Sequence, residues 1–239
     1  MDSEDKYQSV YTRESVNYDR ERYECDYGNL QLRGIYHALD SFVHIGKDTR
    51  VLDVATGTGV VSLYLAQKGG RIEALDITEA MIEQARKKAE SLRLDNISFR
   101  IGSALELPFE NASFDVVTSN KFFHLIPQEM QKKVIGEMLR VLKPGGYLVV
   151  EFKNILYGGL LRIALKYLLR RQEGHCLLPI FPSRLFSGGK IVGMIGYYVP
   201  SQRRLPDWDA LHRLIELGGH IQPFKLFYDK IYIKCEKIG

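Results

Sequence analysis

Two short segments carry residues whose types and spacing suit a ribose-containing ligand. Gly57 and Gly59 follow a short apolar run, Val51–Ala55, and lead into a helical pattern. Glycines at such a turn let a ligand approach the backbone closely, and the N-terminus of the following helix offers free N–H groups. Asp76 ends the next apolar run, Ile72–Asp76, where a carboxylate can accept hydrogen bonds from both ribose hydroxyls. The two segments together predict a nucleoside-binding site.

The spacing of the glycines argues against the two most common nucleotide-binding motifs. A dinucleotide-binding turn needs a third glycine, which allows tight packing over a pyrophosphate, but Ser62 occupies that position. The GxxxxGK[ST] pattern of a phosphate-binding P-loop does not occur in the sequence. We therefore expect a ligand with a ribose and no pyrophosphate. The alternative is that the turn and the acid only connect a strand to a helix.

Strand-like apolar runs alternate with helical patterns through the middle of the chain. This alternation predicts right-handed βαβ units and a doubly wound, mostly parallel α/β sheet. A helix carrying Met130, Val134 and Met138 is expected to stop at Pro144-Gly145-Gly146. The other expected helices are Val60–Lys68 and Glu79–Leu92, and the expected strands are Val51–Ala55, Ile72–Asp76, Ile97–Gly102, Phe114–Ser119 and Tyr147–Phe152.

The two ends of the chain show weaker patterns. Tyr7, Tyr11 and Tyr18 recur at helical spacing, and we expect two helices within residues 1–44. After residue 153 the expected elements are a helix near 156–171, a strand at 190–199, a helix near 207–217 and a strand at 229–236. The predicted organisation is an N-terminal helical lid (1–44), a cofactor-binding α/β core (45–153) and a substrate-recognition insertion with sheet-closing strands (154–239).

The composition is that of an ordinary globular protein. Hydrophobic residues make up 45% and charged residues 26%, and the net charge of +4 is too small to argue for a nucleic-acid partner. Three scattered cysteines, Cys25, Cys176 and Cys235, form no CxxC pair, so we expect neither a metal site nor a disulfide framework. The acidic N-terminus does not fit a signal peptide, and no apolar run reaches the ~18 residues of a membrane span. We expect a cytoplasmic protein.

Four segments resemble, in order and spacing, the motifs of class I S-adenosylmethionine-dependent methyltransferases. The resemblance covers residues 48–153, and its Ala-Thr-Gly-Thr-Gly turn is similar to that of the ubiquinone and menaquinone biosynthesis branch. It implies a seven-stranded sheet with N-terminal lid helices and a helical and β insertion after the fifth strand. The cofactor implied is S-adenosylmethionine, and the partner is a small-molecule acceptor. The segments are Val51–Gly59, Ala74–Met81, Gly102–Phe109 with Phe114–Val117, and Leu139–Gly146.

The resemblance also implies roles around the cofactor's methionine and ribose. Gly57 and Gly59 would line the methionine part, and Asn120 would lie near it. Asp53 would orient the loop and reach the ammonium group, while Asp76 would hold the ribose.

Further implied contacts concern the adenine and the lid. Ile77 and Met81 would flank the adenine, Ala104 and Leu105 would contact its edge, and Tyr18 would close the site from the lid. Two positions depart from the pattern. Ala55 stands where many relatives have glycine, which is tolerable if the φ of Ala55 is negative. Ser103 stands where an aspartate often receives the adenine amino group.

Three features bear on the chemistry near the methyl group. His124 is placed to be a general base, with packing at a helix start as the alternative. Tyr11 and Tyr18 resemble lid aromatics that exclude water, or else simply pack a helix pair onto the sheet. The segment after the fourth strand lacks the consecutive prolines of an Asn-Pro-Pro-aromatic motif, which disfavours methylation of nucleic-acid bases.

The segment 157–171 carries Arg162, Lys166 and Arg170 on an otherwise apolar helical pattern. Three interpretations remain open: a solvated rim, a cap over an apolar substrate with an anionic group, or a helix in transient contact with a membrane surface. We therefore expect methyl transfer to a small apolar or amphipathic acceptor that is quinone-like or lipid-like. The alternatives are a cofactor-binding fold with non-methylating chemistry or a regulatory role, and a nucleic-acid binder using residues 152–204.

Overall fold

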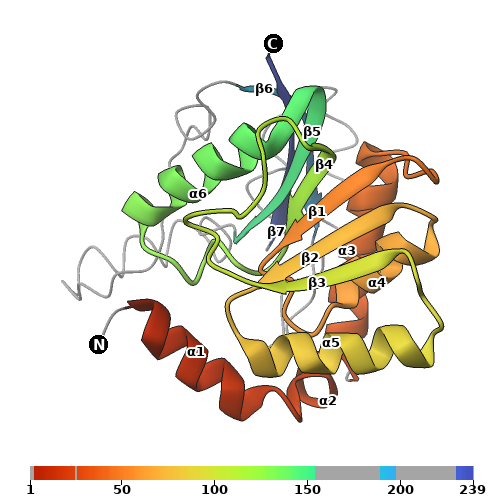
Figure 1. Cartoon of the computed structure of the whole chain (residues 1–239), viewed down its shortest axis with the longest axis vertical. Coiled ribbons are helices and arrows are strands. Elements are labelled where there is room, and N and C mark those ends of the chain that lie inside the picture. The colour runs from red at the N-terminus through yellow and green to blue at the C-terminus, as the bar shows by residue number, and fades with distance from the viewer. Residues whose placement is uncertain (1–2, 25, 154–188, 198–229, 239) are drawn as a thin grey trace, which may run out of the picture.

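The computed structural model describes residues 3–24, 26–153, 189–197 and 230–238 (Figure 1). The helices are α1 (Ser3–Glu14), α2 (Tyr18–Arg22), α3 (Asp26–Phe42), α4 (Val60–Gln67), α5 (Glu79–Ser91) and α6 (Gln128–Val141). The strands are β1 (Arg50–Val54), β2 (Arg71–Asp76), β3 (Ile97–Ile101), β4 (Phe114–Ser119), β5 (Leu142–Lys153), β6 (Gly189–Tyr197) and β7 (Lys230–Lys237).

The strands form one mixed, mostly parallel sheet of seven strands in the order β3-β2-β1-β4-β5-β7-β6. The first five in this order run parallel, and β7 is antiparallel to both of its neighbours. The expected doubly wound, mostly parallel sheet is thus confirmed. Strand order reverses between β1 and β4, and ligands of such sheets bind outside the carboxyl ends of the strands at this switch point.

Helices cover both faces of the sheet, α3 and α4 on one face and α6 on the other (Figure 1). Side chains of β1 alternate between the two layers, because successive residues of a strand point to opposite faces. Val51 packs with α3 and α4, whereas Leu52 and Val54 pack with α6. Val51, Leu52 and Val54 are all fully buried. Burial on both faces of the sheet fixes the register of this central strand.

Two expectations about the elements were wrong in detail. The described N-terminal residues form three helices where two were expected, because the short α2 separates α1 from α3. Strand β5 begins at Leu142, directly after α6, and not at Tyr147. Its pairing with β4 shifts between Phe114 and Val116, and Gly145 within the irregular stretch has a φ of 74°, which glycine adopts at no steric cost.

Several predictions fall outside the described residues. They are the helices expected near 156–171 and 207–217. The membrane-contact interpretation of 157–171 concerns the first of these helices and also falls outside the described residues. None of the helices in the described ranges combines the length and the hydropathy that crossing a membrane requires.

Gly59 brings α4 close to α5. Its φ is 79°, and a Cβ atom built on it would lie 2.8 Å from the Cβ of Ala85. Gly145 shares the positive φ, but a Cβ there would meet no atom within 4 Å. Alanine substitutions at the two glycines therefore distinguish the cost of backbone strain, which both share, from the cost of steric overlap, which only Gly59 has.

We predict that Gly59→Ala destabilises the protein by about 1–3 kcal/mol more than Gly145→Ala, because only the former adds overpacking to the cost of a left-handed alanine. Urea unfolding followed by circular dichroism measures both. In an Ala85→Gly background the difference between the two substitutions should disappear. Equal losses in the wild-type background would contradict this packing role.

Candidate functional site

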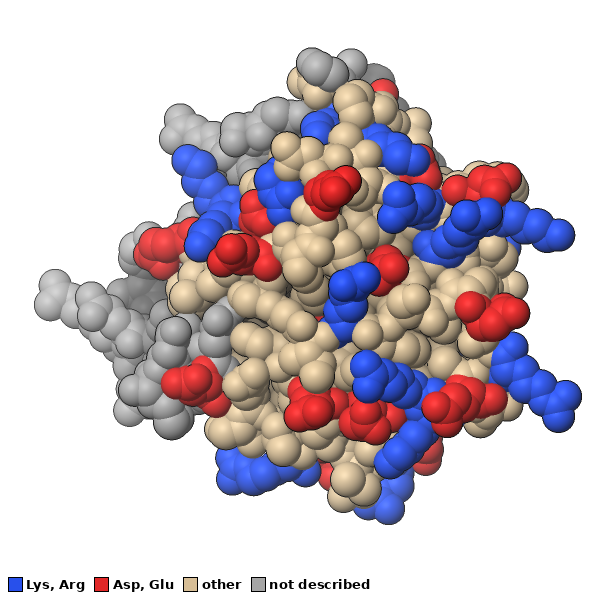
Figure 2. Space-filling view, viewed as in Figure 1, with Lys and Arg blue, Asp and Glu red and all other residues tan. Residues whose placement is uncertain are grey.

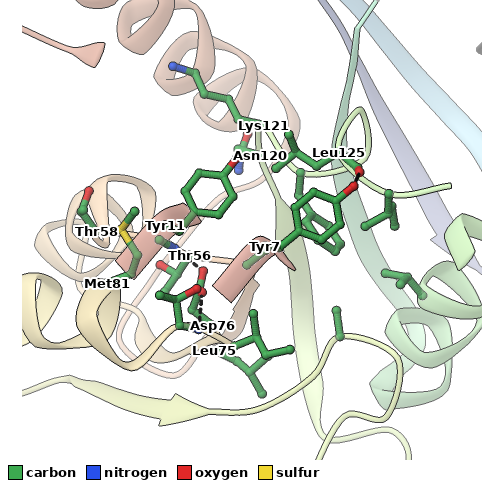
Figure 3. Close-up of a pocket in the computed structure, with 18 of the residues that line it drawn as sticks. Tyr7, Tyr11, Thr56, Thr58, Leu75, Asp76, Met81, Asn120, Lys121 and Leu125 are labelled. Atoms are coloured by element: carbon green, nitrogen blue, oxygen red, sulfur yellow. Dashed lines mark hydrogen bonds between the residues drawn. The ribbon is translucent and has the colours of Figure 1, made fainter. Parts of the chain in front are cut away.

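A pocket lies at the carboxyl ends of β1, β2, β3 and β4, at the switch point of the sheet (Figure 3). Each of the loops that follow these strands contributes to its wall, and α1 and α2 close it from the N-terminal side. Of the predicted cofactor-binding residues, those that line it are Tyr18, Ala55, Gly57, Asp76, Ile77, Met81, Ala104, Leu105 and Asn120. Tertiary structure thus brings together most of the set that the motifs selected.

Gly57 is the residue of the glycine turn whose Cα atom has free space beside it. Its φ is 56°, and a Cβ on it would meet no protein atom within 4 Å. Its backbone N–H donates to Asp76 Oδ2 over 2.7 Å. This hydrogen bond joins the turn after β1 to the end of β2 and leaves the pocket side of the glycine uncovered.

The Asp76 carboxylate is held by backbone donors from two directions. Its Oδ1 accepts from the Thr78 N–H over 2.8 Å, and the side chain is only 8% exposed. Burial raises the pKa of this carboxyl, while the N–H groups of Thr78 and Gly57 act in the opposite direction. The Thr78 hydroxyl and the Ile77 N–H also lower this pKa, so several donors of the chain surround the carboxylate at the pocket wall.

Asp53 does not line the pocket, so its expected contact with the ammonium group of the ligand stays a prediction. It points toward the α4 side of the sheet, 1% exposed. Its Oδ2 accepts from the hydroxyls of Thr56 (2.8 Å) and Ser62 (2.6 Å), which lie 2.5 Å from each other. Burial raises the pKa of Asp53 to about 6 although both hydroxyls lower it. Asp53 is thus hydrogen-bonded to Thr56 in the turn after β1, which is the loop that it was expected to orient.

Two residues of the turn differ from expectation. Ala55 has a φ of 57°, so its backbone adopts the conformation of the glycine it replaces, which costs an alanine about 1–2 kcal/mol. The condition of a negative φ at Ala55 is therefore not met. Gly59 is buried against Ala85 and does not line the pocket, because its close contact with α5 turns it away.

The loop after β3 contributes apolar contacts. Ala104 and Leu105 line the pocket opposite Ile77 and Met81. Ser103 is not among the lining residues, and its hydroxyl accepts the Leu105 N–H over 3.1 Å. Ser103 thus shapes this loop from behind.

A buried polar atom at the end of β4 has no hydrogen-bond partner among the described residues. Asn120 lines the pocket, and its Nδ2 donates to Thr118 Oγ1 over 3.1 Å. Within the described part of the chain its Oδ1 has no hydrogen-bond partner, and neither does the hydroxyl of Ser119. An unpaired buried acceptor costs about 1–3 kcal/mol, so a ligand that donates to Asn120 Oδ1 would be stabilised.

His124 is exposed and is not among the residues that line the pocket. Its neighbours Phe122, Leu125 and Ile126 do line it. The role of His124 as a general base stays a prediction.

Four tyrosines from the N-terminal part of the chain line the pocket: the expected Tyr11 and Tyr18, and also Tyr7 and Tyr23. Tyr18 stands edge-on to both Tyr11 and Tyr23, with ring centroids 6.1 Å apart in each pair. Burial raises the pKa of Tyr11 to about 12, and it raises the pKa values of Tyr18 and Tyr23 as well. Their hydroxyls therefore stay neutral. The helical spacing of Tyr7 with Tyr11 is the signal that could have identified it.

Lys121 also lines the pocket and was missed, because nothing in the local sequence pattern marks it. Its φ is 54°, in the left-handed region that non-glycine residues rarely occupy. Its Nζ lies 4.3 Å from the centroid of the Tyr23 ring, a cation–π distance. Over the described ranges, no three His, Cys, Asp or Glu side chains are grouped to hold a metal ion.

Comparison with known proteins relates this chain to a family. A family model described as a methyltransferase domain matches residues 45–165. The demethylmenaquinone methyltransferase of Listeria welshimeri is 35% identical over 148 residues, which cover 61% of this chain and 61% of that protein. The enzyme of the same name from Renibacterium salmoninarum is 38% identical over 167 residues, covering 70% and 64%. The matched part spans less than two thirds of these relatives.

Solved structures share the fold at lower sequence identity. The [4+2]-cyclase SpnF has a TM-score of 0.68 at 19% identity, covering 98% of this chain and 96% of that chain. Geranyl diphosphate C-methyltransferase from Streptomyces coelicolor, solved with Mg²⁺, geranyl diphosphate and S-adenosyl-L-homocysteine, has a TM-score of 0.59 at 15% identity, covering 88% and 80%. These likenesses concern the fold alone.

The raised pKa of Asp53 leads to a prediction for stability. Its folded pKa of about 6 exceeds the unfolded value near 3.8, so the folded state binds the proton more tightly. This contribution is complete below about pH 4 and is lost as the pH rises through 6. Relative to Asp53→Asn, the wild type should lose about 2–3 kcal/mol between pH 4 and 7.

Urea unfolding at several pH values measures this difference. Asp48→Asn is the matched control, because the Asp48 side chain is 96% exposed, and it should leave the pH profile unchanged. Parallel profiles for wild type and Asp53→Asn would contradict the assignment.

Proposed function

This chain belongs to the methyltransferase domain family, and we propose that it transfers a methyl group from S-adenosylmethionine to a small apolar or amphipathic acceptor. The observation that carries the proposal is the Asp76 carboxylate beside the open turn at Gly57, at the carboxyl ends of β1 and β2. A ribose can donate both hydroxyls to Asp76, and a ligand can approach Gly57 without meeting a side chain.

The residues present fit the cofactor at three separate points. Asp76 lines the pocket, and its carboxylate can accept hydrogen bonds from ribose hydroxyls. The apolar side chains of Ile77, Met81 and Leu105 offer walls for the adenine. The unpaired Asn120 Oδ1 suits the ammonium group of the methionine part. In this proposal Gly57 lies beside that methionine part.

S-adenosylmethionine, when bound, supplies an electrophilic methyl group on a sulfonium that is already a good leaving group. The protein's contribution is then to hold the acceptor at near-attack distance and to exclude water. Tyr7, Tyr11, Tyr18 and Tyr23 cover the pocket with aromatic side chains. The edge-to-face contacts of Tyr18 keep this wall continuous.

The acceptor proposed is apolar or amphipathic and quinone-like. Beyond Asp76 and the glycine turn, the pocket wall toward α6 is apolar, and it consists of Phe122, Leu125, Ile126, Met130 and Val134. Demethylmenaquinone and geranyl diphosphate, which name the activities of the relatives and of one structural neighbour, combine apolar chains with polar oxygen atoms. Lys121 adds a cation beside Tyr23, which suits an oxygen that carries negative charge.

A nucleic-acid substrate has less support. On the face seen in Figure 2, the Lys and Arg side chains are interspersed with Asp and Glu, whereas phosphate backbones favour a basic patch or stripe. The basic stretch 152–204 lies mostly outside the described residues.

We predict that Asp76→Ala weakens binding of S-adenosylhomocysteine at least about tenfold, since each charge-assisted hydrogen bond contributes about 1.5–3 kcal/mol. Isothermal titration calorimetry measures the affinity, and circular dichroism checks that the fold survives. Asp48→Ala, at an exposed aspartate, should bind normally. Unchanged affinity in Asp76→Ala would remove the ribose assignment.

The acceptor class is tested with methyl-labelled S-adenosylmethionine and three probes: a prenylated 1,4-naphthoquinol, a free nucleoside and bulk transfer RNA. We expect label in the naphthoquinol only, because the wall toward α6 excludes polar groups. Label in the nucleoside or the RNA would contradict an apolar acceptor. Cofactor binding with no transfer to any probe would favour the alternative of non-methylating chemistry.

A further inference from the structure

The N-terminal cover, formed by α1 and α2 (residues 3–22), is bound to the core through residues of the pocket itself. Gln8 Nε2 donates to the carbonyl of Ile77 over 2.8 Å, and the Tyr7 hydroxyl donates to the carbonyl of Leu125. Thr58 donates from the turn after β1 to a residue of α2. Ile77, Leu125 and Thr58 all line the pocket, so the position of the cover depends on the loops that shape the site.

Asp19 is the residue of α2 that makes the third of these contacts, and it joins three elements. Its Oδ1 accepts from the Thr58 hydroxyl over 2.5 Å, and its Oδ2 accepts from Lys88 Nζ of α5. Thr58 is only 2% exposed, whereas the side chains of Asp19 and Lys88 are about one third exposed. The Asp19 carboxylate thus bridges the buried hydroxyl of Thr58 and the partly exposed ammonium group of Lys88.

The neighbours of this bridge belong to opposite walls of the pocket. Tyr18 precedes Asp19, and Tyr23 follows the last residue of α2. Both rings line the pocket in edge-to-face contact. On the other side, Thr58 follows Gly57, whose N–H donates to Asp76. Asp19 therefore sets the distance between the tyrosine wall and the carboxylate assigned to the ribose.

We propose that Asp19 is a positioning residue for cofactor binding, which fixes the cover and the glycine turn in one closed arrangement through Thr58 and Lys88. This inference rests on the proposed function, because the ligand that benefits is the cofactor. An isolated ion pair at this exposure contributes little to stability. The bridge acts instead on the fraction of molecules in the closed arrangement, and apparent affinity falls in proportion to that fraction.

The test uses two variants that break the bridge without altering α2: Thr58→Val, which keeps the side-chain volume, and Lys88→Met. Trypsin cleavage after Arg20 and Arg22, both exposed in α2, reports release of the cover and is followed by mass spectrometry. Calorimetry with S-adenosylhomocysteine reports affinity. Lys87→Met is the matched control, since it removes the neighbouring exposed lysine of α5.

We expect each bridge variant to be cleaved faster after Arg20 and Arg22 in the absence of ligand, and to bind S-adenosylhomocysteine about fivefold more weakly. Because both substitutions act through Asp19, the double variant should weaken binding by less than the product of the single effects. The ligand should slow cleavage of the wild type, and Lys87→Met should behave as wild type.

Two results would overturn the proposal: unchanged cleavage in both bridge variants, or fully multiplicative effects on affinity in the double variant. The failure of the proposed function looks different. Wild-type protein would then not bind S-adenosylhomocysteine, while the cleavage rates without ligand would still decide whether Asp19 holds the cover closed.

Discussion

The hydrogen bond from the Gly57 N–H to the Asp76 carboxylate is the interaction on which the site depends. It joins the turn after β1 to the end of β2, the two strands whose carboxyl ends flank the predicted ribose. A side chain at position 57 would face the pocket, and a neutral residue at 76 would leave the turn without its acceptor. Asp53 supports the same turn from the opposite side through Thr56. Two buried carboxylates therefore fix one glycine turn, and only Asp76 lines the pocket.

Burial, more than paired charge, sets the electrostatics of this pocket. Burial is the largest cause of the raised pKa values of Asp53, Asp76, Tyr11 and Tyr18. The hydroxyls and N–H groups around the carboxylates offset part of that cost. In such a buried environment, where the effective dielectric constant is low, each hydrogen bond to a ligand is stronger than in water. An apolar wall toward α6 and a neutral tyrosine wall toward α2 then suit a methyl transfer that depends on alignment.

The cover and the core are coupled because they share residues. The contacts of α1 and α2 with Ile77, Leu125 and Thr58 are made by groups that also shape the pocket. Closing the cover and ordering the loops are thus parts of one equilibrium. A ligand shifts this equilibrium toward the arrangement that it binds more tightly. Asp19 occupies a central place in this coupling because it contacts both the turn and α5.

The sequence alone determined the features that depend on local spacing. The alternation of apolar runs and helical patterns predicted the parallel strands, and the position of Asp76 after the glycine turn led to the prediction of a ribose site. Tertiary structure decided the rest. Ala55 adopts a positive φ, Gly59 packs against Ala85, and Asp53 turns away from the pocket. The bridge from Asp19 to Thr58 and Lys88 joins residues far apart in the chain. Such contacts leave no periodic pattern in the sequence, because periodicity reports which face of one element is buried and not which distant residue covers it.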